Sequence, residues 1–379
     1  MIAHRFLAWA KTAPTEQRAE AAHALARAFL YSEVALEERE GMEAAMTLLL
    51  DDPSPEVRFA LADALANSVE APKHIVLSLV ADRPETAALI LSRSPVLLDT
   101  ELVDIVAAAE EELQAAVARR PALSVAVSAA ISEVGGREAC LALVSNPGAA
   151  IARLSLMRIA DRFGEDGEIR EAMLERPGLP VDVHQYLVRR LGDALGALVA
   201  ARAWVSQERL DGVTRDACDR ATVSIAAETA SDELPALVEH LRVTGQLTTS
   251  LLLRAVCAGN LAFFEAALSV LSGMPEERVS GLIRGGRRAA LKAVYGKAGL
   301  PAIAFDAFEA AVEVCKSCEP PSDPGERLRF ARWIVDRVID RYEGITDGEM
   351  NELMAMLRRF AAEAARSAAR DYAETARAA

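Results

Sequence analysis

The chain contains 379 residues, of which 52% are hydrophobic and only 5% aromatic. Its 42 basic and 56 acidic side chains give a formal net charge of −14. This acidic balance argues against nucleic acids or anionic membranes as general partners, because phosphate contacts need a positive surface. Uncharged stretches are also shorter than the roughly 20 apolar residues that a membrane-spanning helix requires, so we expect no membrane span.

The abundance of Ala and Leu, together with the scarcity of aromatic residues, favours helices over sheets and predicts an all-α fold. Within Thr15–Leu50, the pattern of apolar residues predicts two long helices that cap a helical array. Directly after it, Ser54 is a good N-cap, and Pro55 suits the first position of a helix, where its missing N–H costs nothing.

Prolines with similar surroundings recur along the first half of the chain. They stand at positions 53, 84, 121, 147 and 177, which are 31, 37, 26 and 30 residues apart. That spacing is typical of a two-helix repeat, in which stacked pairs share one core and leave a concave face. Asp52, Pro53, Val57 and Arg58 resemble a HEAT repeat, whereas later units keep only the proline and the apolar spacing. For residues 1–194 we therefore predict degenerate HEAT-like helix pairs, that is, a solenoid.

The second half of the chain is also predicted to be helical, but its helices are shorter and turn residues are more frequent. Residues 195–318 read as shorter helices separated by turn residues, and residues 319–325 form a Pro-rich linker, since such a sequence cannot continue a helix. Residues 326–379 are predicted to form C-terminal helices, the first of them ending near Tyr342. This helical tail is either packed back on the body or paired with a second copy in a homo-oligomer.

One segment of this second half, Leu237–Leu282, resembles a known family. The resemblance is carried by Gly245–Thr248, Leu251–Ala255, Phe263–Glu265 and Gly273–Pro275. These motifs are similar to those of the alphaproteobacterial domain-of-unknown-function 2336 family. The resemblance implies a helical, bacterial and cytoplasmic protein. It supplies no catalytic residues to transfer onto this sequence.

Basic residues concentrate in one short stretch of this acidic chain. Positions 278–297 contain six basic residues and no acid, and Gly285-Gly286 places a turn in the middle. The candidates for binding an anion or a partner are the side chains that flank the turn: Arg284, Arg287, Arg288 and Lys292. A helix N-terminus and guanidinium groups would suit a phosphate or an acidic peptide. Paired with acids elsewhere, the same side chains would form an ordinary solvated helix face.

Other reactive residues give weaker signals. Five cysteines, an odd number, indicate reduced thiols in a cytoplasm rather than a disulfide framework. Cys315 and Cys318 form a lone CxxC motif, which lacks the further ligands of a structural zinc site and leaves either two plain thiols or a redox-sensitive pair. His184 and His240, each beside an acid, are expected to be ordinary helix-face residues. We predict neither a metal nor a cofactor.

The sequence leaves three functional hypotheses. The first is a non-catalytic scaffold or adaptor that binds a protein partner in a bacterial regulatory pathway, because solenoids present large concave surfaces. The alternative is a sensor of an anionic ligand, such as a nucleotide messenger or phosphate, at the 284–292 turn. A helical-repeat enzyme is the third, and it has the least support because the sequence shows no recognisable acid/base constellation.

Overall fold

The computed structural model describes residues 9, 12–202, 206–317, 324–342, 355–363, 365–366, 369–370 and 373. Within these ranges every regular element is a helix, apart from an isolated bridge between Leu123 and Ala149, so the all-helical prediction is confirmed there. None of the described helices has the length and apolar character needed to cross a membrane. The chain divides into two compact units, residues 1–179 (unit 1) and residues 180–379 (unit 2).

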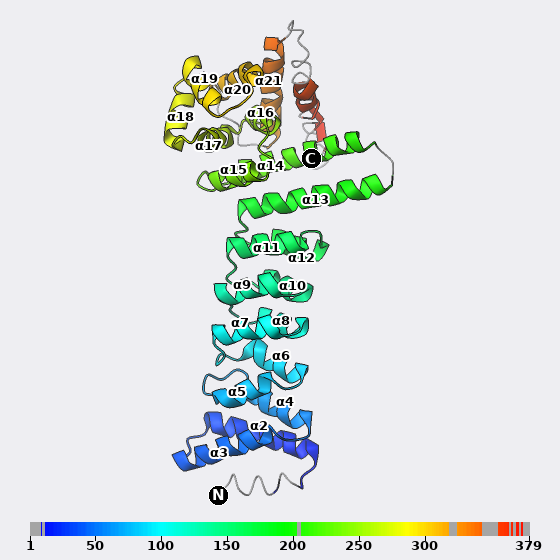
Figure 1. Cartoon of the computed structure of the whole chain (residues 1–379), viewed down its shortest axis with the longest axis vertical. Coiled ribbons are helices and arrows are strands. Elements are labelled where there is room, and N and C mark those ends of the chain that lie inside the picture. Colours follow the sequence, from blue (N-terminus) through cyan, green and yellow to red (C-terminus); the bar gives the residue numbers. More distant parts are fainter. Residues whose placement is uncertain are drawn as a thin grey trace. The chain divides into compact units, whose positions relative to one another are not determined.

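Unit 1 contains two layers of short helices (Figure 1). The first layer contains α2 (Thr15–Tyr31), α4 (Pro55–Leu65), α6 (Pro84–Arg93), α8 (Glu111–Ala118), α10 (Arg137–Ser145) and α12 (Gly167–Leu174). The second layer contains α3 (Leu36–Leu49), α5 (Lys73–Val80), α7 (Asp99–Ala108), α9 (Val125–Val134) and α11 (Arg153–Phe163). Each first-layer helix packs against the next one in its layer, as do α7, α9 and α11. The two helices predicted between Thr15 and Leu50 are α2 and α3.

The core of unit 1 is a series of small aliphatic contacts between these helices. Each helix buries a few side chains, such as Leu61 and Leu65 of α4 or Ile90 and Leu91 of α6. Among the described residues of this unit, Phe29 is the only buried aromatic side chain. Each helix pair therefore depends on its neighbours to cover its apolar face.

Within each layer of unit 1, arginine side chains join one helix to the C-terminal end of the preceding helix of that layer. The Arg120 guanidinium is buried and donates to the carbonyl oxygens of Leu91 at 2.6 Å and Ser94 at 2.7 Å. In the same way, Arg162 donates to the carbonyls of Ser132 and Gly135, both at 2.7 Å. Helix C-termini carry carbonyls that no helical N–H can reach, so each such arginine satisfies acceptors that would otherwise be buried without a partner.

Around α4, arginine–aspartate pairs join the helix ends. Asp52 accepts two hydrogen bonds of 2.9 Å from Arg18, while Arg58 donates to Asp82 at 2.6 and 2.8 Å and to the Asp52 carbonyl at 2.5 Å. These bonds lower the pKa of the Asp82 carboxyl, because its ionised form accepts them. Ser54 occupies the N-cap position of α4 as predicted, but its hydroxyl bonds to Glu56 instead of the backbone.

The recurring prolines do not mark a single layer. Pro53 and Pro84 precede or open the first-layer helices α4 and α6, whereas Pro121 and Pro147 precede the second-layer helices α9 and α11. Proline fits before or at the first turn of any helix, so its position carries no information about the layer. The irregular proline spacing therefore reflects a change of layer as well as variation in repeat length.

Unit 2 contains longer and less regular helices. They are α13 (Val181–Ala201), α14 (Gln207–Glu228), α15 (Leu234–Val243), α16 (Thr249–Cys257), α17 (Leu261–Ser272), α18 (Glu276–Arg284), α19 (Arg288–Lys297), the 3-10 helix η1 (Ala302–Ala304), α20 (Phe305–Ser317) and α21 (Pro324–Tyr342). Residues 355–363 are also helical, and we name them the C-terminal segment.

The predicted domain limits can be placed on these elements. The predicted boundary at residue 194 falls inside α13, and the two units divide between Leu179 and Pro180. In the predicted 319–325 linker, residues 319–323 lie outside the described residues, and Pro324 and Gly325 belong to the first turn of α21. The tail helix predicted to end near Tyr342 is α21, while most of the predicted helix after it also lies outside the described ranges.

A single hydrophobic cluster forms the core of unit 2. Phe264 of α17 stacks on Phe308 of α20 with ring centroids 5.1 Å apart, and Tyr295 of α19 lies 5.3 Å from both Phe305 and Phe308. The same cluster contains buried residues from α15, α16 and α21 and from the C-terminal segment. Unit 2 therefore has a shared aromatic core, in contrast to the layered aliphatic contacts of unit 1.

Candidate functional site

The predicted basic site lies on the turn between α18 and α19. Gly286 has a φ angle of 76°, a left-handed conformation that glycine adopts without strain. Arg284 ends α18, Arg287 occupies the N-cap of α19, and Arg288 begins that helix. Lys292 lies one turn further along. All four side chains are exposed to some degree, and the fold brings them to one corner of unit 2.

Two of these arginines are bound to acids from other helices. Arg284 donates two hydrogen bonds of 3.1 Å to Glu265 of α17, whose side chain is only 5% exposed. Arg288 donates to Asp306 of α20 at 2.8 Å and also to Glu309. These contacts raise the pKa of both guanidinium groups, because the acids stabilise the charged form. Both arginines therefore hold α17 and α20 to the turn.

The other two basic residues extend toward solvent. Arg287 is exposed at the N-cap, and the Lys292 ammonium lies 6.0 Å from the centroid of the Phe305 ring. An anion at this turn would have to compete with Glu265, Asp306 and Glu309 for the neighbouring guanidinium groups. The acidic partners, which the sequence left unidentified, come from α17 and α20. Anion binding at these four residues stays a prediction.

A second charged cluster, which the sequence analysis did not identify, surrounds Arg254 of α16. Arg254 is 6% exposed, and it donates to Glu363 of the C-terminal segment at 2.5 Å. Its guanidinium lies 3.6 Å from Asp216 of α14 and 4.0 Å above the ring centroid of Phe360. The available signal was a lone arginine inside the apolar run Leu251–Val256, because a charge in such a run must find a partner when the helix is buried.

This cluster contains an unusual carboxyl group. The pKa of Asp219 on α14 is raised to about 6, mainly because burial disfavours its charged form, and Asp216 adds repulsion. The Arg254 charge opposes this shift without cancelling it. Titration near neutral pH suits a general acid or base, but the charges that act on this carboxyl are those of Asp216 and of three arginines on α13, α14 and α16, namely Arg189, Arg215 and Arg254.

The cysteine side chains in the core of unit 2 are placed deep enough to lose reactivity. Cys315 is buried and donates to the Val256 carbonyl at 3.4 Å, while burial raises its thiol pKa to about 12. Burial also raises the pKa of Cys257. Such thiols hold their protons at neutral pH and are poor nucleophiles. Cys318, the other half of the predicted pair, lies outside the described residues.

Both histidines singled out from the sequence are half-buried in unit 2. His184 has a pKa lowered by burial. The His240 ring packs edge-on against Tyr186, with centroids 6.2 Å apart. In the described parts of the chain, no group of three or more His, Cys, Asp or Glu side chains is arranged to hold a metal ion.

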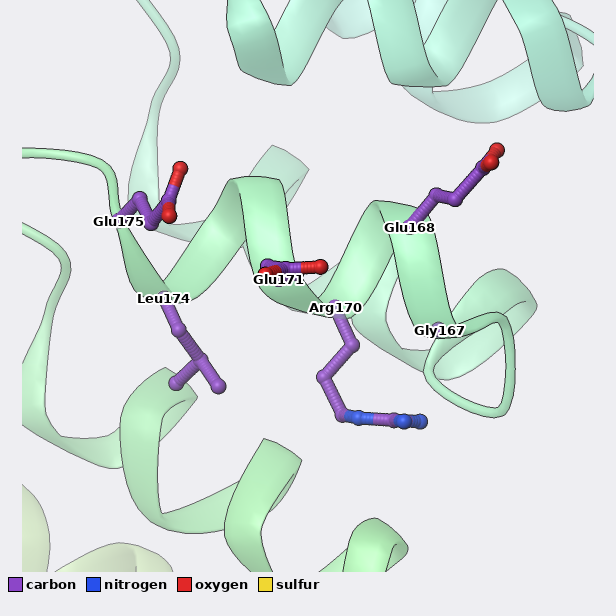
Figure 2. A pocket seen from close by; sticks show the side chains of 6 residues that line it. All are labelled: Gly167, Glu168, Arg170, Glu171, Leu174 and Glu175. Atoms are coloured by element: carbon purple, nitrogen blue, oxygen red, sulfur yellow. The ribbon is translucent and has the colours of Figure 1, made fainter.

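An open hollow of about 520 Å³ lies along α12 of unit 1. Figure 2 shows that Glu168 and Glu175 point to one side of this helix, while Arg170 and Leu174 point to the other. Arg170 donates to the carbonyl of Gly164 at 3.1 Å and so caps the preceding helix. Because these side chains diverge and serve helix contacts, the hollow does not assemble a reactive site.

Comparison with known proteins gives one match. A family model described as an uncharacterised protein conserved in bacteria (DUF2336) matches residues 86–347, more than two thirds of the chain. No curated protein and no solved structure matches. The matched range runs from α6 in unit 1 to just beyond α21 in unit 2, so it includes both the layered helices and the aromatic core.

Proposed function

The chain belongs to this bacterial DUF2336 family, and from its architecture we propose that it is a non-catalytic cytoplasmic scaffold or adaptor that binds a protein partner. We propose further that unit 1 is a HEAT-like solenoid and that it carries the binding surface. The repeated contact of each first-layer helix with the next one in its layer, and of α7 with α9 and α9 with α11, supports this fold. The alphaproteobacterial restriction implied by the resemblance stays a prediction.

The observation that carries this proposal is a set of exposed apolar side chains on the second layer of unit 1. They lie on four of its five helices: Leu36 and Leu48 on α3, Leu77 on α5, Val125 and Val134 on α9, and Leu154 on α11. Leu154 is 76% exposed. Each exposed apolar side chain gains free energy when a partner covers it, at roughly 25 cal/mol per Å² of apolar area.

Acidic residues lie among these apolar positions. Glu37 and Glu38 on α3, Asp104 on α7 and Glu133 on α9 are exposed. Together, the apolar and acidic side chains favour a partner segment with apolar anchors and basic flanks, because opposite charges steer the encounter and select the partner. Unit 1 carries 17 basic and 28 acidic residues, a net charge of −11, which strengthens this selection.

The test uses the full chain as bait in a native lysate of its source bacterium. A double variant, Leu77→Glu and Leu154→Glu, places charges on the second layer. The matched control is Phe59→Glu, because Phe59 is 42% exposed on the first-layer helix α4. We expect quantitative mass spectrometry to show a partner that the wild type and the control capture and the double variant loses at least tenfold.

Two results would count against the scaffold. Capture of the same proteins by all three baits would place binding elsewhere than on the second layer. Capture of none by any bait, with all three baits folded by circular dichroism, would reject a protein-binding role.

The second candidate function is a sensor of an anionic ligand at the basic turn. It is favoured by the exposed Arg287 and Lys292 beside the free N–H groups of the α19 N-terminus. A thermal-shift panel of nucleotides and inorganic phosphate tests it, because a bound ligand raises the melting temperature with concentration. The Arg287→Glu and Lys292→Glu variant should lose any such shift. Absence of a shift with every compound would reject the sensor.

A further inference from the structure

The C-terminal segment packs into unit 2 through buried side chains and ion pairs, in the way that a bound peptide helix occupies a groove. Leu357 is fully buried, Phe360 is 5% exposed, and both belong to the hydrophobic cluster of the unit. Glu363 ion-pairs with Arg254 of α16 at 2.5 Å, and Arg359 lies 3.8 Å from Asp216 of α14. The inward positions are therefore a leucine, a phenylalanine and a glutamate, each three residues after the last, which places them along one helix face.

The C-terminal segment satisfies only part of the hydrogen-bonding capacity of Arg254. Only its Nη1 atom donates to Glu363, while Nε and Nη2 are buried and have no hydrogen-bond partner in the described part of the chain. The nearest further charge is Asp216, 3.6 Å from Nη2. A guanidinium binds a carboxylate most strongly through two parallel hydrogen bonds. A ligand that supplied both would satisfy atoms that the resident segment leaves without partners.

The contact between Glu363 and Arg254 joins two parts of the chain that are far apart in sequence. Glu363 and Arg254 are 109 residues apart, so the contact depends on the return of a distant piece of chain. The segment is held through Leu357 and Phe360, which belong to the hydrophobic cluster of unit 2, and through the Glu363 ion pair. A helix that presents the same three side chains would make the same contacts and would therefore compete with this segment.

We propose that α14 and α16 form a helix-binding groove in unit 2, that the C-terminal segment is its resident ligand, and that a partner protein enters by displacing it with an amphipathic helix of the pattern Leu-x-x-Phe-x-x-Glu. Phe360 and Leu357 mark the apolar subsites, and Arg254 reads the carboxylate. This inference deepens the proposed scaffold by naming a partner chemistry, but it concerns unit 2 and does not depend on the second layer of unit 1.

The experiment measures binding of a fluorescein-labelled synthetic peptide of residues 351–370 to the full chain by fluorescence anisotropy. In wild type the groove is occupied, so binding should be weak. The Leu357→Asp and Phe360→Asp variant disables the resident segment, and we expect it to bind the wild-type peptide at least tenfold more tightly. Adding Arg254→Met to that variant should weaken binding about tenfold.

A double-mutant cycle tests whether Arg254 recognises the carboxylate of Glu363. A peptide carrying Glu363→Gln should lose about as much affinity as the Arg254→Met change, and combining both should cost little more than either alone, since they remove one interaction. A peptide with Arg366→Gln serves as the matched control and should bind like wild type, because Arg366 is exposed and, among the described residues, donates to the Ala362 carbonyl one turn before it.

Each part of the proposal can be overturned by a different result of these experiments. Failure of the peptide to bind the emptied variant, when circular dichroism shows normal helix content, overturns the groove. Additive losses in the cycle overturn the role of Arg254. If the double-aspartate variant does not fold, the Glu363→Arg variant replaces it, because it retains both apolar anchors, and equal peptide binding to it and to wild type overturns the proposal. Dimers of wild type in analytical ultracentrifugation that Glu363→Arg abolishes would assign the groove to a second copy and overturn the partner claim.

Discussion

The two units of this chain reach stability by different physical means. Unit 1 carries a net charge of −11. Its helices make small aliphatic contacts with their neighbours and are joined by arginines that cap helix ends. Unit 2, with 25 basic and 28 acidic residues, carries −3 and gathers its aromatic rings into one cluster. Where each helix contacts only its neighbours, a substitution destabilises only the nearby helices, whereas a substitution in a shared core destabilises every helix that contributes to it. Mutations should therefore produce local effects in unit 1 and collective ones in unit 2.

The largest expected effect comes from the aromatic core. Phe264→Ala removes a fully buried ring that stacks on Phe308, so it should destabilise unit 2 by about 4 kcal/mol through lost packing and the cavity left behind. Denaturant unfolding measures this loss. Hydrogen exchange should rise together in α15, α16, α17 and α20. An increase confined to α17 would contradict a shared core.

The next largest effect tests the arginine caps of unit 1. Arg120→Ala leaves two buried carbonyls, those of Leu91 and Ser94, without their donors, which should cost about 3 kcal/mol. Exchange should rise in α6 and α8 but not in unit 2. Arg158→Ala is the matched control, since Arg158 forms only exposed ion pairs and should change stability by less than about 0.5 kcal/mol. If both substitutions changed the stability equally, the arginine caps would have no structural role.

Sequence reasoning succeeded where a signal is local. The proline-marked turns and apolar spacing predicted α2, α3, α4 and α21, because helix starts depend on the residues beside them. The arginine caps were not predictable, since their acceptors are backbone carbonyls and any residue can supply one. Likewise the proline period did not identify the layers, as the change between Pro84 and Pro121 shows.

The candidate site was predicted in position but not in its interactions. The basic turn lies where Gly286 predicts it, yet the acids bound to Arg284 and Arg288 come from helices 18 to 21 residues away. The Arg254 cluster depends on a contact across 109 residues, which no local pattern encodes. Charge pairing over such separations is decided by packing, so sequence reasoning could locate the basic residues and not their partners.

A smaller, pH-dependent effect is expected from Asp219 in unit 2. Its pKa is raised from 3.8 to about 6, so the folded state disfavours the ionised carboxylate. This penalty is full well above pH 6 and fades as the pH falls from 6 through 3.8, below which the carboxyl is protonated in both states. Asp219→Asn should therefore stabilise the chain by about 2 kcal/mol at pH 7.5 and by much less at pH 4. Thermal melts at both pH values measure the difference, and a gain that does not change with pH would contradict the assignment.

The smallest effect compares one helix cap in each unit. In unit 2, the Thr248 hydroxyl accepts from the Leu251 N–H at 3.1 Å, so Thr248→Ala should cost about 1 kcal/mol. Ser54 of unit 1 occupies the same position on α4, but its hydroxyl bonds to Glu56 and Asp52 accepts from its backbone N–H at 2.9 Å. Ser54→Ala should therefore cost only a few tenths of a kcal/mol. Paired melts of the two variants distinguish a cap that bonds to the helix from one that only occupies the position, and a larger loss at Ser54 would reverse this ranking.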